Sequence, residues 1–224
     1  MDKVHIVLGI SREGIDFQMK QFDKEGIGGV FVHPRPGLIT EYISENWHEL
    51  FDYTVQRGKE LGMDVWIYDE NSYPSGFAGG HVPVQMPESY KNGTGLSISV
   101  MEELNPAPGD SFEVVLEESP RGFKDITANW KNRTGEKGKF YLFSKTFPSR
   151  SYWYGGHSYV DLLYPGVTEK FLEITMEGYE KYNQEDFGHT VRGLFTDEPN
   201  LEAVMTRNTV MRWTPDLWDE FEKR

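Results

Sequence analysis

The sequence predicts an α/β fold in which parallel β/α units are interrupted by an antiparallel β insertion after the third strand. Three observations predict it. Over residues 1–90, short apolar runs alternate with amphipathic helical patterns in the order strand–helix–strand–helix–strand, which is typical of a parallel sheet. Residues 91–156 change to a period of two, with Gly- and Pro-containing turns between the runs. Residues 157–224 return to a helix, a fourth strand and the start of a further helix.

The first three units have clear boundaries. Ser11 and Ser44 each precede an apolar stripe with helical spacing, so we expect their side chains to cap two helices. Gly26 and Gly62 follow these stripes, as glycine does at helix ends. The predicted strands are residues 4–10, 27–33 and 65–68.

The insertion and the last segment follow the same logic. In the insertion, the residues predicted to face its core are Leu96, Ile98, Val100, Phe112, Val114, Leu116, Phe140 and Leu142. Because the insertion follows the third strand, we expect it to form a lid or side wall of a site at that rim. Residues 167–182 are then predicted as a helix and 191–195 as a buried strand, and Thr214-Pro215 is predicted to start a final helix.

Four β/α units are half of a closed eight-stranded barrel, which takes about 250 residues without large insertions. The fold class is therefore predicted to be a partial, half TIM-type β/α barrel. Exposed sheet edges promote association. We therefore expect either a piece of a larger enzyme or a homo-oligomer in which two copies cover each other's edges.

Composition excludes several functions. The net charge of -13 repels phosphate backbones and anionic lipid, so neither nucleic acid nor a membrane surface is an expected partner. The absence of cysteine excludes disulfides and thiolate chemistry. No segment resembles a signal peptide or a bilayer span, so the chain as given is expected to be cytoplasmic, an expectation that does not hold for a trimmed chain. The first strand–helix turn lacks a GxGxxG pattern, and no cofactor is predicted.

Two pairs of carboxylates follow predicted strands. Asp197 and Glu198 end the fourth strand before Pro199, and Asp69 and Glu70 end the third. A partly desolvated Glu198 could keep its proton near neutral pH and act as a general acid. Asp69 or Glu70 could supply the second carboxyl group that glycoside cleavage needs. For both pairs, the structural alternative is capping or loop hydrogen bonding.

The second strand ends in His33 and Arg35, on a turn stiffened by Pro34 and Pro36. Arginine at this position suits a carboxylate, either Asp69/Glu70 or a substrate acid, and the alternative is a structural ion pair. His33 together with Asp69, Glu70 and Asp197 has the ligand types of a metal site, but no signature spacing, so no metal is predicted.

Aromatic side chains accompany these polar ends. Tyr68 ends the third strand, Tyr73 lies in the loop after it, and Trp153 lies in the sequence Tyr152-Trp153-Tyr154. Aromatic rings with polar tips suit sugar rings, whereas packing between insertion and barrel is the alternative. Asp161 is a further candidate for the rim, or a residue that precedes a helix.

The strings HPRPG, VWIYDENSYPSGFAGG, YVDLLYP and GLFTDEPN together resemble the N-terminal part of bacterial (β/α)8 glycoside hydrolases of the α-L-rhamnosidase type. The resemblance covers nearly the whole chain, and WIYDENSYPSGFAGG is its most specific part. It implies that Glu198 is the acid and that His33, Arg35, Asp69 and Glu70 bind sugar. The chain departs at Tyr164-Pro165, where the family usually has Asn-Pro, and the family's chains continue for hundreds of residues.

The leading hypothesis is therefore a glycosidase, or its N-terminal half barrel, acting on an oligosaccharide or glycoside. Catalysis would depend on Glu198 with Asp69, Glu70 or a carboxylate outside this sequence; the other rim residues Tyr68, Tyr73, Trp153, Asp161 and Asp197 would bind substrate. Two alternatives are a non-catalytic carbohydrate-binding or assembly module and a metal-dependent hydrolase on a similar barrel.

Overall fold

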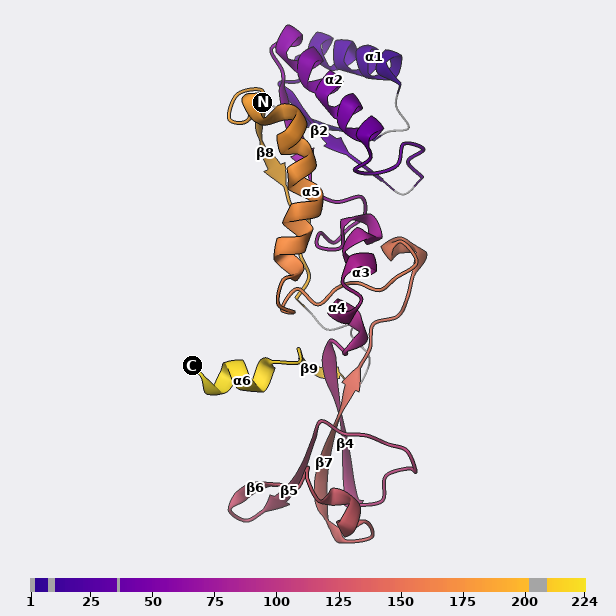
Figure 1. Cartoon of the computed structure of the whole chain (residues 1–224), viewed down its shortest axis with the longest axis vertical. Coiled ribbons are helices and arrows are strands. Elements are labelled where there is room, and N and C mark those ends of the chain that lie inside the picture. The colour runs from indigo at the N-terminus through magenta and orange to yellow at the C-terminus, as the bar shows by residue number, and fades with distance from the viewer. Residues whose placement is uncertain (1–2, 8–10, 36, 202–208) are drawn as a thin grey trace. The chain divides into compact units, whose positions relative to one another are not determined.

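The computed structural model describes residues 3–7, 11–35, 37–201 and 209–224. The chain divides into two compact units, each described by itself (Figure 1). The first consists of Met1–Pro87 and Arg150–Asn200, and the second of Glu88–Ser149 and Leu201–Arg224. The described helices and strands confirm the α/β class. They do not form a closed barrel.

A four-stranded parallel sheet organises the first unit, in the order β1-β2-β3-β8. Helices α1, α2 and α5 accompany it (Figure 1). The strands are β1 (Lys3–Val7), β2 (Gly29–His33), β3 (Asp64–Tyr68) and β8 (Val191–Phe195). The helices of this unit are α1 (Arg12–Lys24), α2 (Glu45–Leu61), α3 (His81–Gln85) and α5 (Val167–Asn183). Residues 8–10 of the predicted first strand, and Pro36, lie outside the described part of the chain.

The predicted helix boundaries are confirmed where a cap was identified. The Ser11 hydroxyl accepts a hydrogen bond from the Gly14 N–H (3.3 Å), and Ser44 accepts one from the Trp47 N–H (3.2 Å). Each bond satisfies one backbone donor that the first helical turn leaves unpaired. Gly62 ends α2 with φ of +69°, a conformation that costs glycine little.

The core of the first unit lies between these helices and one face of the sheet. Because side chains alternate along a strand, every second residue of β2 and β3 faces the helices. Those residues belong to the buried cluster Ile15, Met19, Val30, Val32, Tyr42, Trp47, Phe51, Val55, Met63, Val65, Ile67, Tyr179 and Val191. Phe31 and Trp66 alternate with them and therefore lie on the opposite face, with ring centroids 5.5 Å apart.

The prediction that β8 is buried on both faces is wrong for most of the strand. Val191 is 3% exposed, but Leu194 is 45% and Phe195 40% exposed. The reason is topological. β8 is the last strand of its sheet, so among the described strands it pairs only with β3, and its other edge has one isolated bridge, from Val191 to Phe187. An apolar strand in this position leaves unpaired backbone and apolar surface at the sheet edge.

The second unit is a five-stranded antiparallel sheet in the order β6-β5-β7-β4-β9. Its strands are β4 (Gly95–Glu103), β5 (Val114–Ser119), β6 (Gly122–Asp125), β7 (Lys137–Thr146) and β9 (Thr209–Arg212). Its helices are α4 (Glu88–Lys91) and α6 (Leu217–Glu222). The buried cluster of this unit is Leu104, Val115, Ile126, Trp130, Phe140 and Leu142.

Several sequence predictions for this unit need correction. On β5 the fully buried residue is Val115, not Val114 or Leu116. Side chains alternate between the two faces of a strand, and the face that carries Val115 is the one turned to the core. β6 and β9 were not predicted, and β9 pairs with β4, which lies more than a hundred residues earlier. The final helix begins at Leu217, so Thr214-Pro215 does not cap it.

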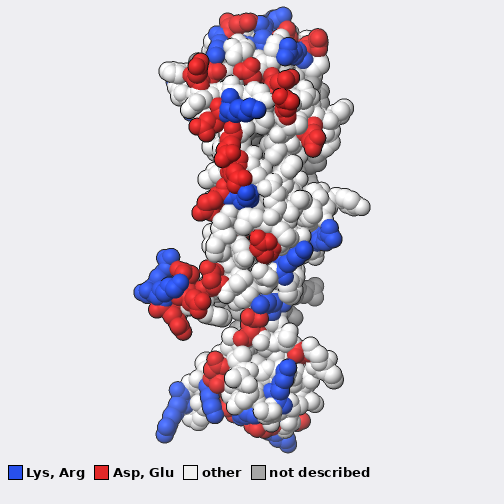
Figure 2. Space-filling view, in the orientation of Figure 1, with Lys and Arg blue, Asp and Glu red and all other residues white. Residues whose placement is uncertain are grey.

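Charge is distributed unevenly over the surface. Acidic side chains gather over the helical face of the first unit (Figure 2), where α5 carries the exposed residues Glu169, Glu173, Glu177 and Glu180. Among the described residues, no helix combines the length and apolar character needed to cross a bilayer.

Candidate functional site at the strand ends

Parallel pairing brings the carboxyl-terminal ends of β2, β3 and β8 side by side, and aromatic rings line this edge. The imidazole of His33 stacks on the ring of Tyr68, with centroids 3.4 Å apart and planes inclined by 15°. Tyr68 in turn stacks on Phe195, with centroids 5.3 Å apart and planes inclined by 16°. Phe195 also meets Phe31 edge-on at 5.6 Å. The face of the sheet turned away from the helices is therefore aromatic.

Asp197 belongs to this aromatic edge. The Tyr68 hydroxyl donates a hydrogen bond to Asp197 Oδ2. Burial, followed by this hydrogen bond to Asp197, raises the pKa of Tyr68, against a smaller lowering by the Arg35 guanidinium. Tyr68 therefore remains a protonated donor over the physiological pH range. The carboxylate of Asp197 keeps further acceptor positions, because each carboxylate oxygen accepts more than one hydrogen bond.

Asp69 lies one residue beyond Tyr68 and makes a different set of contacts. Its side chain is 2% exposed and accepts hydrogen bonds from the Ser75 hydroxyl (2.5 Å) and the Thr196 hydroxyl (2.7 Å). Burial raises the pKa of Asp69, while the two hydroxyl donors lower it. Since Asp69 and Tyr68 are consecutive, their side chains leave the strand on opposite sides.

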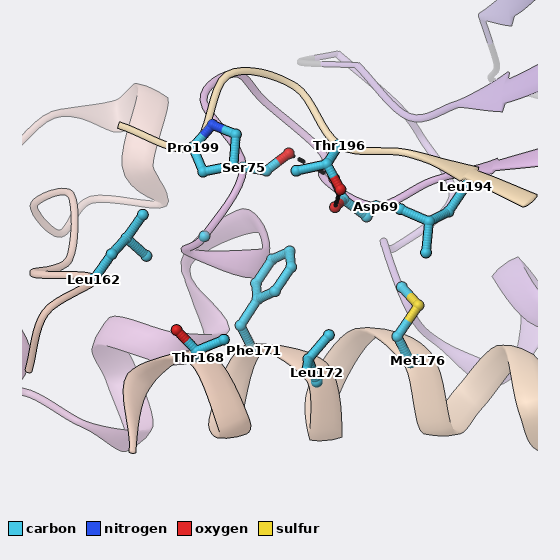
Figure 3. A pocket seen from close by; sticks show the side chains of 11 residues that line it. Asp69, Ser75, Leu162, Thr168, Phe171, Leu172, Met176, Leu194, Thr196 and Pro199 are labelled. Carbon is cyan, nitrogen blue, oxygen red and sulfur yellow. Dashed lines mark hydrogen bonds between the residues drawn. The ribbon is translucent and has the colours of Figure 1, made fainter. Parts of the chain in front are cut away.

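A pocket of about 260 Å³ opens beside Asp69. In Figure 3, Thr196 and Ser75 flank Asp69 on one wall, and α5 forms the facing wall. Because α5 lines this pocket, it lies on the helical side of the sheet and not on the aromatic face. The lining residues are Asp69, Ser75, Gly76, Leu162, Thr168, Phe171, Leu172, Met176, Leu194, Thr196 and Pro199. The pocket is thus apolar apart from Thr168 and the cluster of Asp69, Ser75 and Thr196.

Ser75 joins the ends of β3 and β8. Its hydroxyl donates to Asp69 and accepts a hydrogen bond from the Asp197 N–H (2.9 Å), and its own N–H donates to the Asp197 carbonyl (2.8 Å). Ser75 is not among the site residues predicted from the sequence. Its position in the loop after β3 gave no indication of a partner that lies more than a hundred residues away.

Glu70 is buried inside the loop that follows β3. Its two carboxylate oxygens accept hydrogen bonds from five backbone N–H groups, at 2.6–3.3 Å, those of residues Asn71, Gly76, Phe77, Ala78 and Gly79. Burial raises the pKa of Glu70 to about 8, and the N–H donors oppose this effect. The five hydrogen-bond partners are all N–H donors, so the loop is built around an acceptor. This geometry matches the loop-bonding alternative considered for Glu70.

Glu198 differs from the other three carboxylates because it is exposed. The partial desolvation on which its predicted acid role rested is not found in the described residues. Its backbone has φ of +45°, an unusual conformation for a residue other than glycine. Residues held in such conformations cost about 1–3 kcal/mol and concentrate at functional sites. The backbone at Glu198 thus departs from extended strand geometry directly after β8.

The remaining predicted site residues fall into two groups. Arg35 is exposed and forms no ion pair with Asp69 or Glu70, because hydroxyl and N–H donors already occupy these buried carboxylates. Asp161 is buried, and its Oδ1 accepts a hydrogen bond from the Leu163 N–H (3.0 Å), which is a turn interaction.

Tyr73 and Trp153 come together on neighbouring loops, where the Trp153 indole N–H donates to the Tyr73 carbonyl. The structure therefore brings His33, Tyr68 and Asp197 to one edge and Tyr73 and Trp153 to another part of the same unit. Within the ranges that the structure describes, no three His, Asp or Glu side chains form a group that could hold a metal ion.

Comparison with known proteins gives little beyond this geometry. No protein-family model matches the chain, and no curated protein matches it. One solved structure with similarity is a rhamnosidase from Novosphingobium sp. PP1Y, at 18% sequence identity and a TM-score of 0.30. The match covers 47% of this chain and 10% of the rhamnosidase. A match at this TM-score does not establish a shared fold.

Proposed function

We propose that this chain binds a glycoside at the carboxyl-terminal ends of β2, β3 and β8, and that Glu198 is the general acid of a glycoside hydrolase. The observation that carries the proposal is the stacked series His33–Tyr68–Phe195, in which the Tyr68 hydroxyl donates to Asp197, the residue before Glu198. His33 and Tyr68 are each 1% exposed, so Phe195, which is 40% exposed, is the ring of this series that can pack against the C–H face of a sugar. Carboxylates accept hydrogen bonds from sugar hydroxyls. Ligands of parallel α/β folds bind at this end of the strands.

The sequence resemblance supports the same proposal. The strings that resemble α-L-rhamnosidase-type hydrolases include the ends of all three strands: HPRPG follows β2, YDENSYPSGFAGG follows β3 and TDEPN follows β8. Three of the four strings that carry the resemblance therefore cover the carboxyl-terminal ends of neighbouring strands.

We further propose that the parallel sheet is half of a β/α barrel, with more strands beyond β8. The exposed edge of β8 supports this. A second pocket, of about 270 Å³, runs along its outer side between Met176 of α5 and Leu194, and both residues also line the pocket beside Asp69. Parallel sheets normally have both faces covered, so a groove beside a strand with one open edge fits a further strand and helix.

One observation favours the alternative of a carbohydrate-binding module without turnover. Hydrolysis needs a second carboxylate beside the acid. Of the described candidates, Glu70 is enclosed by five N–H donors, and Asp69 is bonded to Ser75 and Thr196 on the helical side. Asp197 is the carboxylate on the aromatic face, and it accepts from Tyr68. On this alternative, the rim binds sugar and the described carboxylates carry out no hydrolysis.

The test compares Glu198→Gln with wild type on two kinds of glycoside. A general acid contributes about 10²–10⁴-fold when the leaving group needs a proton, and much less when it leaves as a stabilised anion. We therefore expect Glu198→Gln to slow phenyl glycosides by this factor and nitrophenyl glycosides far less. Glu177→Gln, at another exposed glutamate, is the matched control and should match wild type.

Three outcomes separate the two functions. Equal rates for Glu198→Gln and wild type on both substrates would remove the acid assignment. Sugar-dependent thermal stabilisation of wild type without turnover would support the binding module. Neither turnover nor stabilisation, over a broad set of sugars, would contradict the proposed function as a whole.

A further inference from the structure

Two loops of the first unit are held together, residues 71–80 after β3 and residues 150–157 before α5. The indole N–H of Trp153 donates to the carbonyl of Tyr73. Gly155 lies directly on Gly79: a Cβ atom at Gly155 would approach the Gly79 carbonyl oxygen to 2.7 Å. With φ of +63°, Gly155 also has a conformation that other residues rarely adopt. The backbone contact therefore requires glycine.

Aromatic packing beneath this contact anchors both loops. The ring of Tyr154 meets Phe77 edge-on at 5.1 Å and Tyr159 at 5.7 Å. The Tyr159 hydroxyl donates to the Ser75 carbonyl (2.6 Å), and Phe77 and Tyr159 are buried. Since the N–H groups of the first loop also converge on Glu70, its backbone is fixed from inside. Both loops therefore hold one arrangement without a ligand.

Above these anchors, two aromatic side chains stay at the surface. Tyr73 is 45% exposed and Trp153 is 40% exposed, although both belong to loops with a packed interior. The neighbouring Tyr152 is 99% exposed. Neither Tyr73 nor Trp153 belongs to a buried cluster, so core packing does not account for these residues. Rings held in place before binding lose little conformational entropy when a ligand arrives.

We propose that Tyr73 and Trp153 form an aromatic subsite that binds a neutral pyranose ring of the carbohydrate, apart from the unit that is cleaved at Glu198. A pyranose offers a C–H face for the exposed rings, and its hydroxyl groups can bond the Tyr73 phenol. The net charge of -13 disfavours anionic ring ligands such as nucleotides, whereas a neutral sugar has no charge to be repelled. This inference rests on the proposed function, which supplies the carbohydrate.

The subsite contributes to binding of the oligosaccharide and takes no part in cleavage of the glycosidic bond. Its removal should therefore raise KM for an oligosaccharide and leave kcat almost unchanged, whereas Glu198→Gln should lower kcat. A short aryl monoglycoside, which does not reach the subsite, should be insensitive to the change. A change in KM therefore identifies the subsite, and a change in kcat identifies Glu198.

The experiment measures binding by calorimetry for wild type, Trp153→Ala, Trp153→Phe and Tyr73→Ala. The probes are cellotetraose, a rhamnose-containing pectic oligosaccharide and methyl α-L-rhamnopyranoside. For an oligosaccharide that wild type binds, we expect Trp153→Ala to weaken binding about tenfold and Trp153→Phe to retain part of it. Trp218→Ala is the matched control, because Trp218 is 42% exposed and lies in the second unit. Circular dichroism and the thermal midpoint check that each variant folds.

The outcomes distinguish failure of the subsite from failure of the function. Equal affinities of wild type, Trp153→Ala and Tyr73→Ala for a bound oligosaccharide would overturn the subsite and leave the proposed function in place. A wild type that binds none of a broad sugar set would overturn both. A tenfold loss in Trp218→Ala equal to that in Trp153→Ala would also overturn the subsite, since it would place the effect elsewhere.

Discussion

His48 provides a direct test of the packing between α2 and α5. Its side chain is 5% exposed; its ring stacks on Tyr182 at 5.4 Å and meets Tyr179 edge-on at 5.0 Å. Its Nδ1 atom is buried and has no hydrogen-bond partner within the part of the chain that the structure describes. A protonated imidazole at this position would carry a charge with little solvation, so the folded protein favours the neutral form.

The size of the effect on stability follows from the pKa of His48 in the unfolded chain and its pKa in the folded chain. Burial, followed by the nearby ammonium of Lys181, lowers the pKa of His48 from 6.5 to about 4. The unfolded chain therefore binds more protons than the folded chain between these two values, and stability falls as pH falls. The contribution is complete above pH 6.5 and is lost progressively as the pH falls to about 4. At about 1.4 kcal/mol for each pKa unit, the loss is at most about 3 kcal/mol.

The assay is urea unfolding of wild type and His48→Leu at about pH 7 and about pH 4. Other groups titrate over the same range, so the quantity of interest is the difference between the two proteins. Wild type should lose up to about 3 kcal/mol more unfolding free energy than His48→Leu. His189→Leu removes an exposed histidine and should behave as wild type. Equal losses in wild type and His48→Leu would refute the reasoning.

Three further predictions concern close contacts and the sheet edge. A Cβ atom at Gly178 would approach His48 Nε2 to 2.2 Å, so Gly178→Ala should destabilise the fold by about 1–3 kcal/mol. Adding His48→Ala should recover part of this loss in thermal denaturation, and strictly additive effects would contradict the contact. Glu70→Gln places an NH2 group against backbone N–H donors and should lower the unfolding free energy by about 1–3 kcal/mol. An unchanged urea midpoint would argue against a stabilising role of these N–H hydrogen bonds. Finally, the open edge of β8 should lead a second copy of the chain to associate there, and Leu172→Glu or Leu194→Lys should shift the population to monomer in sedimentation velocity. A wild type that stays monomeric at high concentration would exclude this association.

Local sequence determined most of the secondary structure of the first unit. Ser44 and Gly62 bound α2 because a hydroxyl acceptor and a left-handed glycine satisfy helix ends wherever they occur. The apolar run Val191–Phe195 coincides with β8 because it is short, apolar and followed directly by charged residues and proline. The motifs at the ends of β2, β3 and β8 could also be identified, since the polar residues follow each strand in the chain.

Long-range pairing decided what those motifs do. The sequence places Asp69 and Glu70 at a strand end, but the fold encloses Glu70 in five backbone donors and bonds Asp69 to Thr196, which is more than a hundred residues distant. β9 joins β4 because an antiparallel edge was open, which no local pattern encodes. The exposure of Phe195 likewise depends on its strand being the last in the sheet. Backbone propensity and capping act over a few residues, whereas burial and hydrogen-bond partners depend on segments that only the folded chain brings together.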